Sequence, residues 1–193
     1  MAQLALSQST VSTKPTPEAD LDRAVAELLT GAEELAQLGP APRAELVRTC
    51  LASVRPIMAE WSRLGLVAKR LPADSAEEWL AGPLPTVFQL RLLADSLDRI
   101  AARGRPEFGT GVRQRDDGRL EVAVFPASRL DQVLSHGLSA YVLLQANVDR
   151  DAALEAQAAL YQRSDPDAGV ALVLGGGNVS SIPPTDVLTQ VFN

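Results

Sequence analysis

The sequence is poor in several residue types that common functions need. Its 193 residues include one cysteine and one histidine, and aromatic residues make up 4% of the chain. Because Cys50 has no second cysteine, a framework of disulfides within the chain is excluded. A single histidine, His136, excludes a metal site built from a histidine cluster. The scarcity of aromatic side chains disfavours a stacking platform for single-stranded nucleic acid.

Positive charge and long apolar runs are also scarce. Lysine and arginine together number 18 against 24 acidic residues, so the formal net charge is −6 and a nucleic-acid partner is disfavoured. No apolar run reaches the roughly 20 residues that span a bilayer, so we expect no membrane segment. The first residues carry no cationic stretch followed by a long apolar one, unlike a secretory signal. A cytoplasmic protein is therefore expected.

The first half of the chain has a helical period. Residues 1–17, rich in Ser, Thr and Pro, predict a disordered tail. Helices are expected from Glu18 to Gly39-Pro40, over 41–70 with an interruption at Pro56, and over 86–103. The apolar stripes that predict them are Leu21, Val25, Leu28, Ala32 and Leu35; Leu46, Cys50, Val54 and Ile57; and Val87, Leu90, Leu93, Leu97 and Ile100.

The second half changes to a period of two. In residues 118–125 the apolar Leu120, Val122 and Val124 alternate with Arg119, Glu121 and Ala123. This pattern predicts a half-buried strand after a tight turn at Asp117-Gly118. Partner strands are expected near 109–115 and 138–145, with a helical turn at 129–135. A helix over 149–163 follows, with Asp149 or Asp151 as its N-cap.

The end of the chain carries the most informative pattern. An apolar run at 169–175 enters the glycines 175–177 and Asn178, and then a helix that Ser180 or Ser181 could cap, with Pro183-Pro184 in its first turn. Such a run is typical of a buried parallel strand, and ligands bind at the carboxyl ends of such strands. Glycines and a helix N-terminus admit an anion, and the Asn178 amide can hold an oxyanion. A plain strand-to-helix turn is the alternative, because Ser180 breaks GxGxxG and no lysine completes a phosphate loop.

Other polar residues favour structural interpretations. Cys50 lies on an apolar stripe, as a small buried hydrophobe does. His136 is typical of a loop, and Asp116-Asp117 of a turn. Glu77-Glu78 suits a first helical turn, where negative charge complements the dipole. The fold class expected is α/β: N-terminal amphipathic helices and antiparallel strands lead into the first strand of a parallel sheet.

The string LVLGGGNVSSIPPTDVLTQVF (172–192) resembles the segment that opens the nucleotide-binding domain of the aldehyde dehydrogenase superfamily. It is most similar to a bacterial branch with a GAGN-VSSIPP-DVL loop. LDRAVAELLTGAEELAQL, EEWLAGP, LRLLADSLDRIA and GRLEVAVFP resemble upstream pieces of that branch, so most of residues 20–193 are covered. Gly176 stands where the branch usually has Ala, and LTQVFN lacks an expected Tyr-Lys pair.

The resemblance implies an NAD(P)-dependent oxidoreductase that oxidises an aldehyde to an acid. Asn178 would donate its amide to the thiohemiacetal oxyanion, and Gly175, Gly176, Gly177 and Asn178 would line the nicotinamide side of NAD or NADP. The family's later lysine, glutamate base and nucleophilic cysteine have no counterpart here. The chain thus resembles an N-terminal portion, expected to be catalytically silent alone.

The same resemblance implies an organisation and partners. Residues 18–193 would be an incomplete N-terminal part of the fold, with arm strands for oligomerisation at 118–145 and the start of the nucleotide-binding sheet at 169–193. The expected partners are an aldehyde in the full-length family and either a second copy or a missing C-terminal part. The residues also leave open a non-catalytic interaction or scaffold protein, whose sheet edge pairs with another chain, and a functionless fragment.

Overall fold

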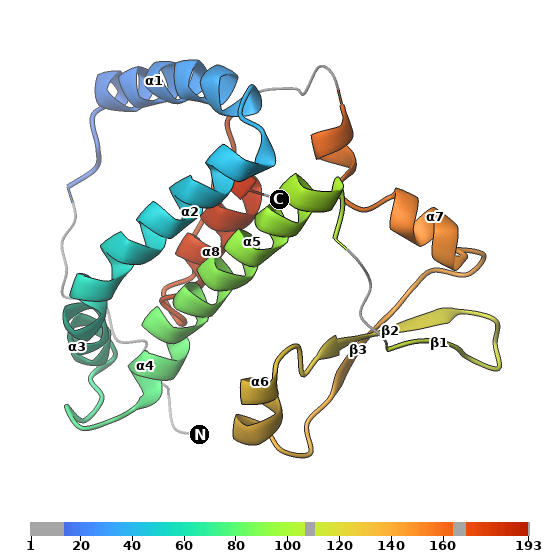
Figure 1. The fold of residues 1–193 in the computed structure, drawn as a ribbon. Helices are drawn as coiled ribbons and strands as arrows, with labels where there is room; N and C mark the ends of the chain where they lie inside the picture. Colours follow the sequence, from blue (N-terminus) through green and yellow to red (C-terminus); the bar gives the residue numbers. More distant parts are fainter. Residues whose placement is uncertain (1–13, 107–110, 164–168, 193) are drawn as a thin grey trace, which may run out of the picture. The chain divides into compact units, whose positions relative to one another are not determined.

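A computed structural model gives the structure of the chain and describes residues 14–106, 111–163 and 169–192 (Figure 1). The chain divides into two compact units: Met1–Leu97 with Pro166–Asn193, and Asp98–Asp165. A disordered tail is predicted for residues 1–17. Residues 1–13 lie outside the described residues, and residues 14–17 form no helix or strand. In the described ranges, no helix combines the length and the apolar character needed to cross a membrane.

The first unit is built from helices. They are α1 (Glu18–Ala36), α2 (Pro40–Val54), the 3-10 helix η1 (Arg55–Ile57), α3 (Met58–Lys69), α4 (Glu77–Ala81), α5 (Pro83–Arg103), which belongs to the second unit from Asp98 onward, and α8 (Ile182–Phe192). The helical stretches predicted at 18–38, 41–70 and 86–103 are confirmed. The expected interruption at Pro56 is the 3-10 segment η1, because proline removes a helical N–H donor.

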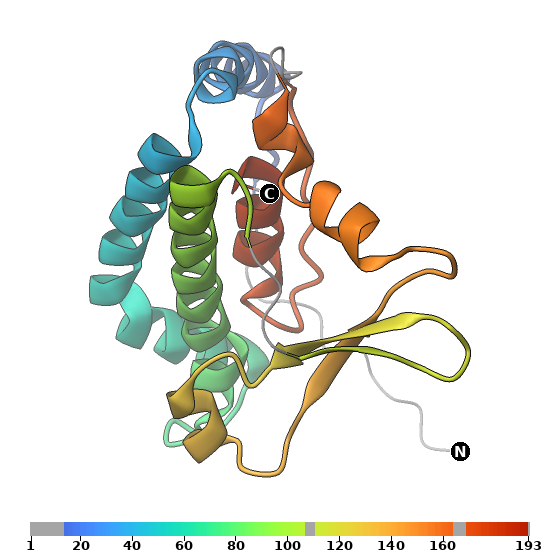
Figure 2. The same cartoon turned by 45° about the vertical axis from the view of Figure 1, so that its right-hand side comes forward.

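Helices α2, α5 and α8 lie side by side in the first unit (Figures 1 and 2). Gln89 on α5 donates to the Thr185 carbonyl (3.0 Å) and to the Thr189 hydroxyl (2.9 Å) on α8. The predicted stripe of α5 supplies the buried Leu90 and Leu97, which confirms it. The unit's buried apolar residues are Ala44, Val47, Leu66, Leu90, Ala94, Leu97, Leu188 and Phe192.

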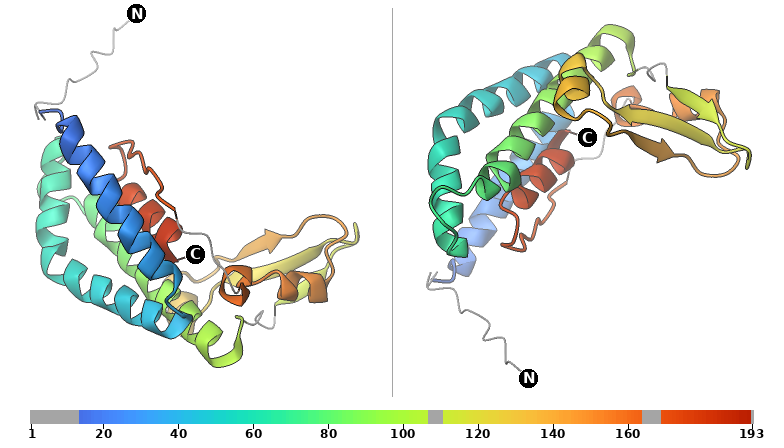
Figure 3. Two further views of the ribbon diagram at one scale, coloured as in Figure 1. Left: turned by 90° about the horizontal axis from the view of Figure 1, so that it is seen from above. Right: turned by 90° about the horizontal axis from the view of Figure 1, so that it is seen from below.

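Two predicted helix faces are wrong. On α2 the buried residues are Arg43, Ala44 and Val47, whereas Leu46 and Ile57 of the expected stripe are exposed. Arg43 turns this face inward, because its guanidinium donates to carbonyls at the ends of α1 and α8. The stripe of α1 includes no buried residue: Leu21, Val25 and Leu28 are exposed. Helix α1 is nearest the viewer in the left panel of Figure 3.

The second unit holds a three-stranded antiparallel sheet in the order β1-β2-β3 (Figure 3). Its elements are β1 (Val112–Gln114), β2 (Leu120–Phe125), α6 (Arg129–Leu134), β3 (Ala140–Leu143), α7 (Arg150–Glu155) and the 3-10 helix η2 (Ala159–Gln162). The predicted tight turn is confirmed: Gly118 has φ +81° and donates its N–H to the Arg115 carbonyl (2.9 Å). The partner strand expected near 109–115 is found as β1; residues 109 and 110 lie outside the described residues.

The helix expected over 149–163 is interrupted. Asp149 caps α7 by accepting from the Ala152 N–H (2.8 Å), which settles the choice between Asp149 and Asp151. Ala158 then takes φ +54°, a left-handed conformation that cannot continue a helix, and η2 follows. The single long helix is therefore replaced by two short segments.

The alternation predicted for 118–125 is only partly right. Val122 is buried, but Val124 is 47% exposed and Glu121, expected to face water, is buried. Two arginines explain Glu121: Arg113 Nε donates to its Oε1 (2.7 Å) and Arg115 Nη1 to its Oε2 (3.1 Å). Burial raises the pKa of Glu121, but these hydrogen bonds and the positive charges outweigh it and hold the pKa below its ordinary value.

The lowered pKa of Glu121 makes the stability of the second unit depend on pH. The carboxylate's contribution is present above the unfolded pKa, about 4.3, and is lost as the pH falls through the lower folded pKa. We expect Glu121→Gln to lower the melting temperature at neutral pH and to flatten its acid dependence. The 19F resonance of 3-fluorotyrosine at Tyr141, whose ring lies 5.2 Å from Arg113 Cζ, reports unfolding of this unit. Parallel melting curves of the two proteins between neutral and acidic pH would contradict the assignment.

Helices and antiparallel strands together give a mixed α/β chain, but the expected strand at 169–175 is wrong. These residues are extended, yet among the described strands none pairs with them, and the one sheet found is antiparallel. A strand is defined by backbone hydrogen bonds to a neighbouring strand. Residues 171–174 lie beside the helix α8 instead, where no backbone ladder can form.

Candidate functional site

The glycine loop lies between this extended segment and α8. Gly175, Gly176, Gly177 and Asn178 are all exposed, so the structure places the four predicted site residues together at one surface. Two of the glycines are required by geometry: a Cβ at Gly175 would come 2.6 Å from Pro183 Cγ, and Gly177 has φ +75°. Within the described chain, no hydrogen bond restrains the Asn178 side chain. The loop therefore presents bare backbone and one free amide.

The N-terminus of α8 offers fewer donors than its sequence suggested. Pro183 and Pro184 have no N–H, and the Ile182 N–H donates to the Val179 carbonyl (3.3 Å). The Ser181 N–H is used as well, by the Ala81 carbonyl (3.0 Å). The expectation of free helical N–H groups for an anion is therefore wrong at these positions. The donors left to a ligand are the loop backbone before Ser180 and the Asn178 amide.

Ser180 attaches the loop to the helices beneath it. Its hydroxyl donates to Glu78 Oε2 (2.9 Å) and accepts from the Trp61 indole Nε1 (3.0 Å). The side chain is thus engaged in the interior. For Ser180, this replaces the N-cap role that the sequence predicted.

Glu78 is completely buried and is paired with a lysine. The Lys69 ammonium contacts Glu78 Oε1 and lies 3.2 Å from Glu77 Oε1. The hydrogen bond to Glu78 is the main reason that the pKa of Lys69 is raised; partial burial opposes it and Glu77 adds to it. The prediction that Glu77 and Glu78 lie in a first helical turn is confirmed by α4. The sequence does not predict that Glu78 pairs with Lys69 and Ser180.

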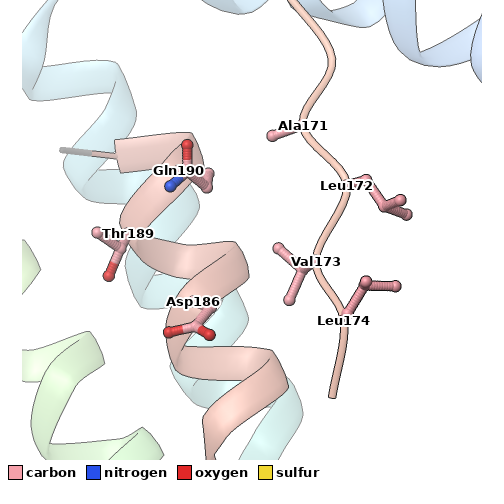
Figure 4. Close-up of a pocket in the computed structure, with 7 residues that line it drawn as sticks. All are labelled: Ala171, Leu172, Val173, Leu174, Asp186, Thr189 and Gln190. Carbon is pink, nitrogen blue, oxygen red and sulfur yellow. The ribbon is translucent and has the colours of Figure 1, made fainter. Parts of the chain in front are cut away.

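A shallow hollow of about 320 Å³ adjoins the loop (Figure 4). It is lined by Ala171, Leu172, Val173, Leu174, Asp186, Thr189 and Gln190. Figure 4 shows Ala171 and Val173 projecting toward α8, whereas Leu172 and Leu174 project away from it. These two leucines are 84% and 78% exposed. The segment is thus covered only in part, on the face that carries the half-buried Val173.

The remaining candidates lie elsewhere in the chain. Cys50 is a free thiol on α2 and is half-buried, so the prediction of a buried small hydrophobe holds only in part. His136 is exposed in the turn after α6, as expected. Asp116 and Asp117 lie in the β1–β2 turn, where Asp117 binds Arg119 (2.7 Å), as the turn interpretation predicts. Among the described residues, no cluster of three or more His, Cys, Asp or Glu side chains could hold a metal.

Comparisons with protein-family models, with curated proteins and with solved structures found no match to this chain. The site is therefore defined by its own residues. Sequence patterns identified the loop and missed Glu78, Trp61 and Lys69, which hold it. One signal was present: Gly65 interrupts a helical pattern, and a Cβ there would overlap the Glu78 carboxylate.

Proposed function

We propose that this chain is the N-terminal part of an NAD(P)-dependent aldehyde dehydrogenase, in which Gly175–Asn178 contacts the cofactor. The observation that carries the proposal is the exposed glycine loop with a free amide, held from below by Ser180. The motif LVLGGGNVSSIPPTDVL supports it from the sequence. The isolated chain would be inactive, since a nucleophile, a base and a complete pocket are needed together.

The residues present fit one side of the cofactor better than the other. Exposed glycines allow a flat ring to approach the backbone, and the Asn178 amide can donate to an oxygen. The α8 terminus, with two prolines and an occupied Ile182 N–H, is poorly suited to a diphosphate. We therefore assign the loop to the nicotinamide side. The bound cofactor would accept the hydride, while Asn178 would orient the aldehyde oxygen by donating its amide hydrogen.

A titration with NAD⁺ and NADP⁺, followed by 15N NMR, tests this proposal. We expect weak binding, in the millimolar range, with shift changes confined to residues 175–181. Asn178→Ala should reduce the affinity severalfold, and Gln132→Ala, which removes an exposed amide from α6 in the second unit, serves as the matched control. Loop resonances that do not move at millimolar cofactor would contradict the proposal. Micromolar binding would contradict the prediction that the chain lacks most of the pocket.

A non-catalytic interaction protein is the second candidate, favoured by the exposure of Leu172 and Leu174 on an unpaired extended segment. A second copy could pair along this segment by strand addition. Light scattering after size exclusion should then show a discrete dimer that Leu174→Asp dissociates. A monomer at all accessible concentrations, or a dimer indifferent to Leu174→Asp, would count against this candidate.

A further inference from the structure

Four side chains beneath the glycine loop form a continuous polar chain. The Lys69 ammonium and the Ser180 hydroxyl each engage one oxygen of the Glu78 carboxylate, and the Trp61 indole donates to the Ser180 hydroxyl. The Ser180 hydroxyl thus acts once as donor and once as acceptor, which fixes the direction of its O–H bond. Glu78 is completely buried, so its charge is met inside the protein by the Lys69 ammonium at Oε1 and by the Ser180 hydroxyl at Oε2.

Two glycines leave room for this polar chain. A Cβ on Gly82 would come 2.6 Å from Ser180 Oγ and 3.2 Å from Trp61 Nε1. A Cβ on Gly65 would overlap the Glu78 carboxylate itself. Gly65 lies within α3, where alanine would be the better helix former. Glycine at position 65 is therefore explained by the room that the Glu78 carboxylate needs, and Gly82, the C-cap of α4, leaves room for Ser180 and Trp61.

We propose that Glu78 is a positioning residue that acts through Ser180 to fix the conformation of the loop Gly175–Asn178. Ser180 follows Asn178 by two residues, so a displaced Ser180 also displaces the exposed Asn178 amide. Glu78 itself is buried and touches no ligand. The part of the proposal that concerns cofactor affinity rests on the proposed function; the part that concerns loop conformation does not.

The Ser180–Glu78 bond is separable from the docking of α8. Gln89 holds the first and middle turns of α8 through Thr185 and Thr189, and Arg43 holds its last turn through the Val191 carbonyl (3.2 Å). Removal of the Ser180 hydroxyl should therefore free the loop while α8 stays in place. If Ser180 were needed only for folding, its substitution would loosen both the loop and α8.

Hydrogen exchange in the full chain measures this separation directly. We expect Ser180→Ala to accelerate exchange of the Ser181 and Ile182 amides about tenfold, the effect of losing one hydrogen bond of ordinary strength. Amides in the middle of α8 should keep their rates. The matched control, Ser53→Ala, removes an exposed hydroxyl that donates to the Thr49 carbonyl on α2. It should leave the loop unchanged.

Trp61 donates to the Ser180 hydroxyl, so its fluorescence reports whether that hydroxyl is in place. In a Trp79→Phe background Trp61 is the single tryptophan, and Ser180→Ala should shift its emission to longer wavelength and increase quenching by acrylamide. Rescue tests the acceptor: Glu78→Gln with Lys69→Met keeps an oxygen for Ser180 and removes the unpaired charge. The Ser181 amide should therefore exchange slowly in this double variant, as it does in the wild type. In Glu78→Leu, which offers Ser180 no acceptor, it should exchange faster.

The outcomes distinguish the two proposals. Faster loop exchange in Ser180→Ala, with weaker NAD⁺ binding, supports both. Faster loop exchange in a chain whose loop resonances never respond to NAD⁺ supports the positioning role and contradicts the proposed function. Unchanged Ser181 exchange, or equal acceleration throughout α8, would overturn the positioning role. If Ser180→Ala does not fold, the Glu78→Gln/Lys69→Met pair and Trp61→Phe decide by the same exchange measurement.

Discussion

Gly65→Ala should destabilise the first unit by about 2–3 kcal/mol, although alanine is the better helix former by about 1 kcal/mol. The new Cβ would overlap the Glu78 carboxylate, which is completely buried and cannot move into water without leaving Lys69 and Ser180. Displacing one member of a buried pair leaves an uncompensated charge. Urea unfolding followed by tryptophan fluorescence reports this unit, because Trp61 and Trp79 both lie in it.

Gly31→Ala is the matched control for this variant. Gly31 lies within α1, is exposed, and has open space where its Cβ would be. We expect the substitution to leave stability unchanged or to raise it by up to about 1 kcal/mol. In a Glu78→Ala background the effect of Gly65→Ala should change sign and become stabilising. The steric explanation is wrong if Gly65→Ala destabilises equally with and without the Glu78 carboxylate.

Local patterns predicted the helices well, because a helix is specified mainly by residues three and four apart. The stripe through Leu90 and Leu97 identified both α5 and its buried face. The same logic failed for α2, where Arg43 counts as polar in any pattern yet is 6% exposed. Its partners are the ends of α1 and α8, and residue 191 is too far along the chain for a pattern to reveal.

The candidate site shows the same division between local and distant information. The loop is predicted by the sequence, since three glycines before a predicted helix form a local signal. The residues that hold it come from α3 and α4, more than a hundred positions earlier, and no local period connects Glu78 to Ser180. The strand expected at 169–175 failed for a related reason: its residues favour an extended backbone, but a strand also needs a neighbouring strand.

Arg43→Met is the second substitution with a large expected effect, a loss of about 3 kcal/mol of the free energy of unfolding. Arg43 donates to the carbonyls of Leu35 (2.7 Å) and Leu38 (3.0 Å) at the end of α1, and of Val191 (3.2 Å) near the end of α8. The last carbonyls of a helix have no partner within it, and a cation there also complements the dipole. Methionine fills the space but supplies neither the hydrogen-bond donors nor the positive charge. Urea unfolding at neutral pH measures the loss.

Two further variants separate the effect of the guanidinium's several N–H donors from the effect of its positive charge. Arg43→Lys keeps the charge but concentrates its donors on one nitrogen, which cannot reach three carbonyls, so it should recover less than half of the lost stability. Arg48→Met on the same helix removes an exposed pair with Glu45 and should cost at most about 0.5 kcal/mol. If Arg43→Lys matched the wild type, the charge alone would hold the helix ends. In that case the contacts to Leu35, Leu38 and Val191 would add little, and the inward turn of α2 would need another cause.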